Sequence, residues 1–297
     1  MASAKKLFRI AVAATTVLGC AVCVSRAAKA QETASSTIQT TPLKPPANGP
    51  INVAFVISEG ADVMDIAGPW EVFSDAMLTS KGKPWHETDG MDDMLMPFRT
   101  YTVSDSLKPV KASNGLIIVP NYSFETAPRP QVIVIPAQDG RSDAQKAWLL
   151  SNSKTDDITM SVCTGASMLA QYGLLDGLTA ATHHMFAAGM QKQYPAVHFV
   201  SGTRFVDHGK VATAGGLTSG IDLALHVVDR YYGQDVAQVT ANILEYRGEL
   251  WKNPKFDEVT PVVAARSSRV SGVRRGRDRL RWPFPLPNVR RDPAPSP

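Results

Sequence analysis

The amino-acid sequence predicts an α/β fold with a mostly parallel central sheet. Residues 51–57 form a continuous apolar run, typical of a strand that lies inside such a sheet and is covered on both faces. A second strand-like run, residues 158–162, turns abruptly at Cys163-Thr164-Gly165 into a segment of Ala, Ser, Met and Leu that favours a helix. With 297 residues, 44% of them hydrophobic, the chain suits one large domain with appendages or two small domains.

The start of the chain is typical of an export signal. Residues 1–30 combine a positive start, an apolar run at 10–24 that is too short to span a membrane comfortably, and a small-x-small site at 28–30. We interpret them as a signal peptide of a periplasmic or secreted protein. The alternative is a lipoprotein signal, with the chain lipid-anchored through Cys20.

Removal of this signal changes both the cysteine count and the charge. Cys20 and Cys23 leave with it, so Cys163 is the only remaining thiol and no intramolecular disulfide is possible. The segment carries five basic residues and no acids, so the net charge falls from +4 to −1. A catalytic role would explain why an exported protein keeps one unpaired cysteine in an oxidising compartment.

The predicted domain covers residues 51–255 and is flanked by segments without periodicity. Residues 31–50 are rich in Thr, Ser, Ala and Pro and are predicted to be a flexible linker. Residues 266–297 contain nine arginines and several prolines, which predicts a disordered Arg/Pro-rich tail. Such a tail makes weak contact with anionic surfaces or serves only as a solubilising end.

Strands and helices are expected to alternate through the domain. A helix is expected from about residue 67 to 78, because Gly68-Pro69 suits a first turn, and Asp65 is expected just before it as an N-cap. The other expected strands are residues 98–104, 116–119, 132–135, 179–182, a stretch near 199 and 210–213, and the other expected helices are 142–151, 221–232 and 235–251.

Cys163 is the candidate nucleophile. A cysteine at a strand-to-helix elbow lies over the first turn of the helix, where unpaired backbone N–H groups favour the thiolate. Gly165 is expected to let the backbone turn tightly. The competing interpretation is that Cys163 is an inert, buried, small apolar residue.

Three separated motifs resemble the ThiJ/PfpI family of the class I glutamine-amidotransferase-like superfamily. They are DIAGPWEVF at 65–73, the stretch 158–184 around the cysteine, and TAGGLTSGIDLALHVV at 213–228. The likeness is strongest to isonitrile hydratases and to the amino-terminal domains of AraC-type regulators. It implies a flavodoxin-like three-layer sandwich, a cysteine at a nucleophile elbow and a homodimer.

The resemblance also implies roles for residues around Cys163. Asp65 would hydrogen-bond the cysteine and move its proton. Thr164 is shared with hydratase-like members, whereas peptidase members have a histidine there. His183 would lie near the cysteine with a part in proton transfer, and His184 stands where relatives often have tryptophan, which alters the pocket wall.

The resemblance places an anion hole at the turn after residues 132–135. There Ala137 and Gln138 replace two glycines of many relatives, and a backbone N–H of this turn would pair with the N–H that follows the cysteine. Gly165 and Gly216 are expected beside the same pocket. Relatives also connect the first helix to the next strand more briefly, so residues 80–97 form an insertion, either a lid or part of a dimer interface.

The sequence thus predicts an exported cysteine-dependent hydratase or hydrolase acting on a small electrophile. No metal or organic cofactor is expected, since His86 stands alone among acidic residues in the insertion. No helix-turn-helix pattern follows the core, so specific nucleic-acid binding is not expected. The alternatives are a non-catalytic thiol or redox sensor or ligand-binding module of the cell envelope, and a glyoxalase-like activity on reactive aldehydes.

Overall fold

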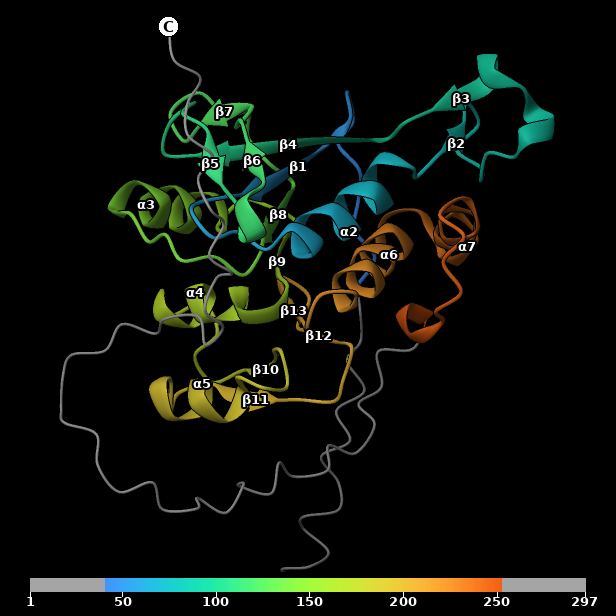
Figure 1. Ribbon diagram of the computed structural model, residues 1–297. Helices are drawn as coiled ribbons and strands as arrows, with labels where there is room; N and C mark the ends of the chain where they lie inside the picture. Colours follow the sequence, from blue (N-terminus) through green and yellow to red (C-terminus); the bar gives the residue numbers. More distant parts are fainter. Residues whose placement is uncertain (1–40, 253–297) are drawn as a thin grey trace, which may run out of the picture. The chain divides into compact units, whose positions relative to one another are not determined.

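The computed structural model describes residues 41–252, and its centre is a seven-stranded sheet (Figure 1). Only the edge pair β12–β13 is antiparallel, and every other pair in this sheet is parallel. In spatial order the strands are β12 (Phe205–Asp207), β13 (Val211–Ala214), β9 (Ile158–Ser161), β8 (Val132–Ile135), β1 (Ile51–Val56), β4 (Phe98–Ser104) and β7 (Tyr122–Ser123).

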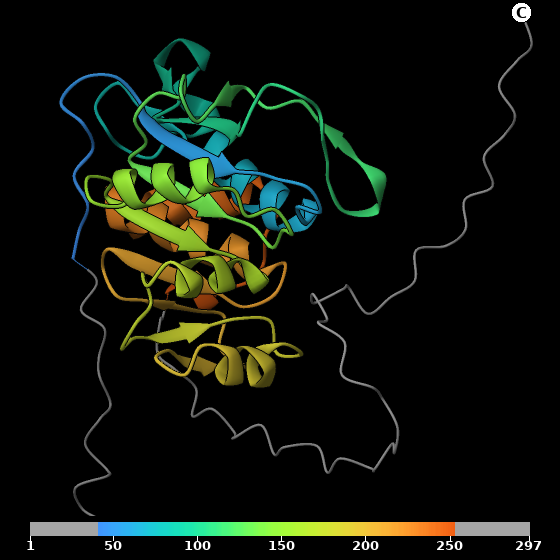
Figure 2. The same cartoon turned by 90° about the vertical axis from the view of Figure 1, so that its left-hand side faces the viewer.

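Helices cover both faces of this sheet (Figures 1 and 2). One face carries α2 (Val63–Ser74), α6 (Ser219–Tyr232) and α7 (Gln234–Ile243), and the other carries α3 (Asp143–Asn152), α4 (Ala166–Gln171) and α5 (Ala187–Gln193). The predicted flavodoxin-like three-layer sandwich is confirmed.

The apolar strands hold the layers together because alternate side chains of one strand enter opposite faces. In β1, Phe55 belongs to the core under α2 and α6, whereas Ala54 and Val56 belong to the core under α3 and α4. The continuous apolar pattern of residues 51–57 is thus explained by burial on both faces.

Three small two-stranded sheets lie outside the central one. β10 (Thr179–Ala181) pairs with β11 (His198–Val200), and β5 (Val110–Lys111) pairs with β6 (Ile117–Ile118). β2 (Leu78–Thr79) pairs with β3 (Met94–Leu95) around the segment predicted as an insertion. The strand predicted at 116–119 therefore exists as β6, but in a hairpin beside the central sheet.

Three predicted helix boundaries were wrong, one of them the end of α2, which lies at Ser74 rather than near residue 78. Helix α2 begins at Val63, because the Asp62 side chain accepts a hydrogen bond from the Met64 N–H and caps the helix. Asp65 therefore lies inside the first turn, and Pro69 lies in the second turn. At the other end of the chain, α7 ends at Ile243 rather than near 251, and a short 3₁₀ turn, Leu250–Lys252, follows.

Part of the predicted flexible linker is docked on the domain. The Leu43 N–H donates to the Arg230 carbonyl at 2.7 Å, and the Arg230 Nε donates to the Thr41 carbonyl at 3.1 Å. The Leu43 side chain packs against the core. The prediction was thus wrong for residues 41–43, while the predicted signal peptide and Arg-rich tail lie outside the described residues.

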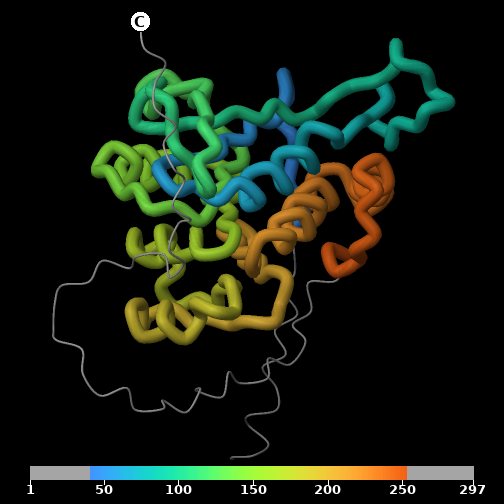
Figure 3. Tube along the Cα trace, viewed as in Figure 1, coloured from blue at the N-terminus to red at the C-terminus, as the bar shows by residue number. Residues whose placement is uncertain are grey.

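The insertion does not form a lid. The β2–β3 hairpin connects the end of α2 to the start of β4, so it lies at the amino end of the parallel strands. Figure 3 shows it extending away from the body of the domain. Cys163 follows the carboxyl end of β9, at the opposite edge of the sheet. A role for the hairpin in a dimer stays a prediction, and none of the helices within residues 41–252 meets the length and hydropathy needed to cross a membrane.

Candidate active site

Cys163 lies at a sharp elbow between β9 and α4. Its φ angle is +59°, a left-handed conformation that is uncommon for a residue other than glycine and that turns the chain from strand to helix within one residue. The Cys163 N–H donates to the Gly215 carbonyl at 2.7 Å, and the Thr182 hydroxyl donates to the Cys163 carbonyl at 2.9 Å. These bonds hold the elbow from two sides, and Cys163 as a whole is only 3% exposed.

Gly165 serves this elbow differently from the expectation. Its φ is −53°, so the tight turn is made by Cys163 itself. A Cβ on Gly165 would lie 2.2 Å from the Ile135 carbonyl oxygen, so glycine is needed for close packing of the elbow against β8. Gly165 thus allows the elbow that carries Cys163 to pack closely against the backbone of Ile135.

Asp65 is a fully buried carboxyl at the same edge of the sheet. The Ala137 N–H donates to its Oδ2 at 3.0 Å, and its Oδ1 has no hydrogen-bond partner among the described residues. Burial raises the pKa of Asp65 to about 8, and the Asp62 carboxylate adds to the increase, while the N–H groups of Ala137 and Leu217 oppose it. Asp65 is therefore mostly protonated at neutral pH.

The Cys163 thiol is also held in its protonated form. Burial and the Asp65 carboxylate raise its pKa to about 12, and Asp62 contributes in the same direction. The backbone N–H groups of Thr164 and Leu217 favour the thiolate, but they are outweighed. The prediction of a thiolate favoured by the helix terminus was wrong, because desolvation and nearby carboxylates dominate over the first turn of a short helix.

The hydrogen-bond donors around the sulfur also differ from the predicted set. The Ala137 N–H is engaged by Asp65. The Gln138 side chain accepts from the Ser58 hydroxyl at 2.6 Å and donates to the Val56 carbonyl at 2.9 Å, so it braces two loops.

The backbone N–H groups that act on the sulfur are those of Thr164, as expected, and of Leu217, which sequence reasoning missed. Leu217 has a φ of +49° and follows Gly215-Gly216, of which Gly216 was predicted to lie beside the site. The two glycines were the feature of the sequence that could have indicated an unusual backbone, and hence an available N–H group, at Leu217.

His183 and Gly216 are packed against each other. A Cβ on Gly216 would lie 2.2 Å from the His183 Cδ2, so only glycine accommodates the imidazole there. The His183 Nδ1 accepts a hydrogen bond from the Met185 N–H at 3.2 Å, and its ring stacks on the exposed His184 with centroids 4.5 Å apart. Burial and the charge of His184 lower the pKa of His183, which favours a neutral ring with the proton on Nε2.

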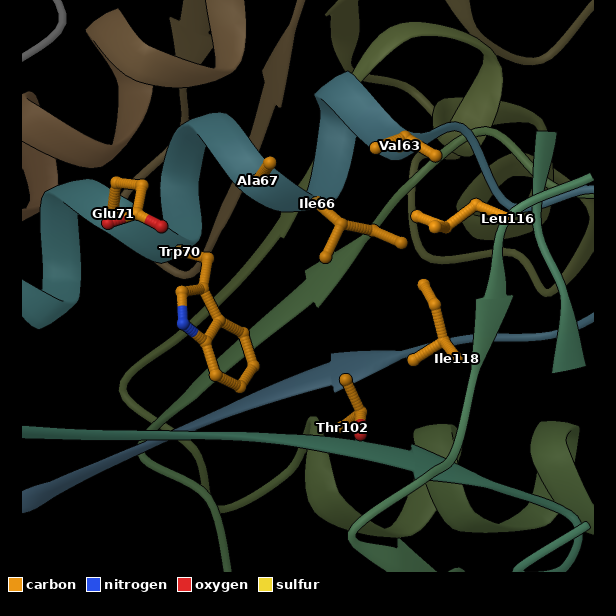
Figure 4. Close-up of a pocket in the computed structure, with 8 residues that line it drawn as sticks. All are labelled: Val63, Ile66, Ala67, Trp70, Glu71, Thr102, Leu116 and Ile118. Atoms are coloured by element: carbon orange, nitrogen blue, oxygen red, sulfur yellow. The ribbon is translucent and has the colours of Figure 1, made fainter. Parts of the chain in front are cut away.

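An apolar pocket of about 240 Å³ lies on the outer side of α2, between this helix, β4 and the β5–β6 hairpin (Figure 4). Its lining includes Ile66, Trp70, Leu116 and Ile118, with Glu71 at one end. Cys163 and Asp65 do not line it. Trp70 therefore lines a hollow that is separate from the residues around Cys163.

The described residues contain no group of three or more His, Cys, Asp or Glu side chains arranged to hold a metal ion. The site instead assembles a thiol, a carboxyl, an imidazole and backbone N–H groups. Four of its segments are the turns after β1, β8, β9 and β13, at the carboxyl ends of strands of the central sheet, and His183 follows β10 of the small β10–β11 sheet. This edge is the usual place for a functional site in an open parallel sheet.

Among curated proteins, isonitrile hydratase of Pseudomonas putida is 28% identical over 220 residues, which cover 72% of this chain and 85% of that protein. The HTH-type transcriptional regulator GbdR of Pseudomonas aeruginosa is 28% identical over 153 residues, which cover 50% of this chain and 41% of the regulator. The match to the regulator thus leaves more than half of its length uncovered.

Solved structures share the fold. A ThiJ/PfpI family protein from Pseudomonas syringae superposes with a TM-score of 0.56 at 26% identity, covering 69% of this chain and 79% of that one. Drosophila melanogaster DJ-1beta gives a TM-score of 0.54 at 17% identity, with 66% and 98% covered. The model of the DJ-1/PfpI family matches residues 51–230. The resemblance inferred from three motifs is thereby confirmed, and the chain belongs to the DJ-1/PfpI family.

Proposed function

We propose that this protein is an exported, cysteine-dependent hydratase that adds water to the terminal carbon of an isonitrile. The observation that carries the proposal is the buried pair of Cys163 and Asp65, whose raised pKa values leave two protons beside one sulfur nucleophile. The likeness to an isonitrile hydratase over most of that protein's length supports the same reaction class.

Asp65 acts first as the proton donor. Its carboxyl gives a proton to the terminal carbon of the isonitrile, which becomes electrophilic, and the resulting carboxylate takes the proton of the Cys163 thiol. The sulfur electron pair then forms the S–C bond and yields a thioimidate on Cys163. The Thr164 and Leu217 N–H groups stabilise the negative charge that develops on sulfur.

Water completes the reaction. Its oxygen adds to the thioimidate carbon while one of its protons passes to the substrate nitrogen. The C–S bond then breaks with its electron pair on sulfur, and the remaining hydroxyl proton passes to the sulfur as the C=O bond forms. The product is an N-substituted formamide. His183, with its proton on Nε2, serves as a hydrogen-bond donor to the adding water or to the substrate nitrogen, and the Thr164 hydroxyl helps to orient the adduct.

The test is the appearance of formamide from an alkyl isonitrile, followed by NMR with the purified protein. Cys163→Ala and Asp65→Asn are expected to lose at least about a hundredfold in rate, since each removes a reacting group. Glu71→Gln, an exposed carboxylate on the same helix, is the matched control. Turnover by the wild type that survives in Cys163→Ala would refute the mechanism.

The two alternatives lack support from the geometry. A redox sensor relies on a thiol that is already deprotonated at rest, whereas burial and the Asp65 carboxylate raise the pKa of Cys163. A glyoxalase-like reaction needs a stronger catalytic role for His183, yet its Nδ1 is engaged by the Met185 N–H.

The proposal includes export and self-association. The features of residues 1–30 support a signal peptide, which fractionation of expressing cells would test. The apolar pocket beside α2, together with the exposed apolar side chains Leu116, Ile117 and Val119 of the adjoining hairpin, supports a homodimer through this face. Light scattering on the protein and on an Ile117→Asp variant tests this, with a monomeric wild type as the contrary result.

A further inference from the structure

Asp62 and Asp65 clamp the first turn of α2 onto one residue of the turn after β8. The Asp62 N–H donates to the Ala137 carbonyl at 2.8 Å, and the Ala137 N–H donates to the Asp65 Oδ2 at 3.0 Å. The Asp62 Oδ1 meanwhile accepts from the Met64 N–H at 3.0 Å. The Asp62 carboxylate is thus fixed in place one helical turn from Asp65.

Asp62 differs from Asp65 in being partly exposed. Its carboxylate therefore meets solvent one helical turn from the buried Asp65, beside the turn that holds Ala137. The ion pairs found within residues 41–252 do not include Asp62, so no Lys or Arg within 4.0 Å neutralises it.

The charge of Asp62 acts on three groups of the site at once. Burial is the main cause of the pKa shifts of Cys163, Asp65 and His183, and the Asp62 carboxylate raises the pKa of each. The other ionisable groups facing these residues are His184, which adjoins His183, and the Cys163–Asp65 pair itself.

Two further charges belong to the adjacent loops. The Asp139 carboxyl packs against Gly60, and Arg141 donates to the carbonyls of Gln138 and Gly140. Arg141 also donates to the Ser167 hydroxyl at 3.1 Å. Neither charge is among the influences on the pKa of Cys163.

We propose that Asp62 is a specificity-determining residue, which makes the entrance to Cys163 electrically negative and restricts the site to neutral or cationic electrophiles. This inference rests on the proposed function, where it names the substrate class, and it excludes substrates with a carboxylate, sulfonate or phosphate near the reacting carbon. A fixed negative charge repels such groups most strongly where solvent screening is weak. Asp62 acts through the field at the site and does not react itself.

The experiment compares two reagents of similar size and opposite charge on Cys163. Sulfonatoethyl methanethiosulfonate is an anion and trimethylammonioethyl methanethiosulfonate is a cation, and peptide mass spectrometry follows modification of Cys163 in the full chain. The variant Asp62→Asn removes the charge, while asparagine caps a helix about as well as aspartate. Asp62→Ser is a second neutral cap in case the first variant folds poorly.

The cation-to-anion rate ratio is expected to fall about tenfold in Asp62→Asn and to lose much of its dependence on salt. The pH at which Cys163 becomes reactive is expected to move down. Glu71→Gln removes an exposed charge of the same helix outside the site and is expected to leave the ratio unchanged.

An unchanged ratio in both neutral-cap variants would overturn the inference, whether or not the wild type converts isonitriles. A changed ratio without any isonitrile turnover would support the electrostatic role and refute the proposed hydratase. Because thiol modification requires no catalysis, the two failures are distinguishable.

Discussion

The burial of Asp65 makes a quantitative prediction about stability. Its pKa rises from 3.8 to about 8 on folding, so between these values the folded protein holds a proton that the unfolded chain has released. The proton on Asp65 therefore favours the folded state. This contribution to the free energy of unfolding is fully present below pH 3.8 and is lost as the pH rises toward 8. Within this window the free energy of unfolding falls by about 1.4 kcal/mol for each pH unit. At pH 7 the wild type has therefore lost roughly 4 kcal/mol relative to the fully protonated protein.

The perturbation is Asp65→Asn, which removes the titration and keeps an oxygen that accepts from the Ala137 N–H. The variant is expected to be more stable than the wild type at pH 7 and to gain steadily between pH 5 and 8. Urea unfolding at several pH values, with Glu71→Gln as the exposed-carboxylate control, measures the difference. If the difference between wild type and Asp65→Asn does not change with pH, the assignment of a raised pKa is wrong.

Three further changes test the architecture around the site. Gly216→Ala is expected to displace His183 and lower the catalytic rate at least about tenfold with an intact fold, as checked by isonitrile kinetics beside circular dichroism; an unchanged rate would contradict the close packing. Gly165→Ala should destabilise by about 1–3 kcal/mol, because its Cβ meets the backbone of β8, and denaturant unfolding checks this. Arg230→Met leaves the buried Asp207 carboxylate without its 3.0 Å ion pair, at a cost of about 3–5 kcal/mol; a melting temperature equal to that of the wild type would refute this.

The sequence was most informative where local pattern and burial agree. The apolar runs in β1 and β8 were recognisable because strands buried on both faces lack regular polar alternation. β9, with Thr159 and Ser161 between apolar residues, was recognisable as β-prone next to the helix formers that follow it. The elbow at Cys163 was recognisable because a β-prone run changed to helix formers within one turn. These features depend on residues that are neighbours in the sequence, and they include the candidate nucleophile Cys163.

The start of α2 was misjudged from the local pattern. Residues 63–66 contain Val and Ile, and Gly68-Pro69 looks like a helix beginning. The structure begins the helix earlier because Asp62 caps it through a local bond from the Met64 N–H, a signal that the sequence contained and that Gly68-Pro69 obscured. The bond of Asp65 to Ala137, by contrast, joins residues 72 positions apart, so only the fold brings these two partners together.

The protonation of Cys163 was missed for a related reason. A helix terminus is visible in the sequence, whereas desolvation and the proximity of two carboxylates depend on how α2 packs beside the elbow. The donor role of Leu217 likewise depends on its left-handed backbone, which Gly215-Gly216 signalled only indirectly.

The docking of residues 41–43 on Arg230 fixes where the chain enters the domain. Arg230 lies in the last turn of α6, while the first turn of the same helix adjoins the loop of Leu217 at the active site. The 14 residues of α6 span about 20 Å at 1.5 Å each. The described chain therefore joins the domain about one helix length from the loop that carries Leu217, at the end of α6 opposite to the one nearest Cys163.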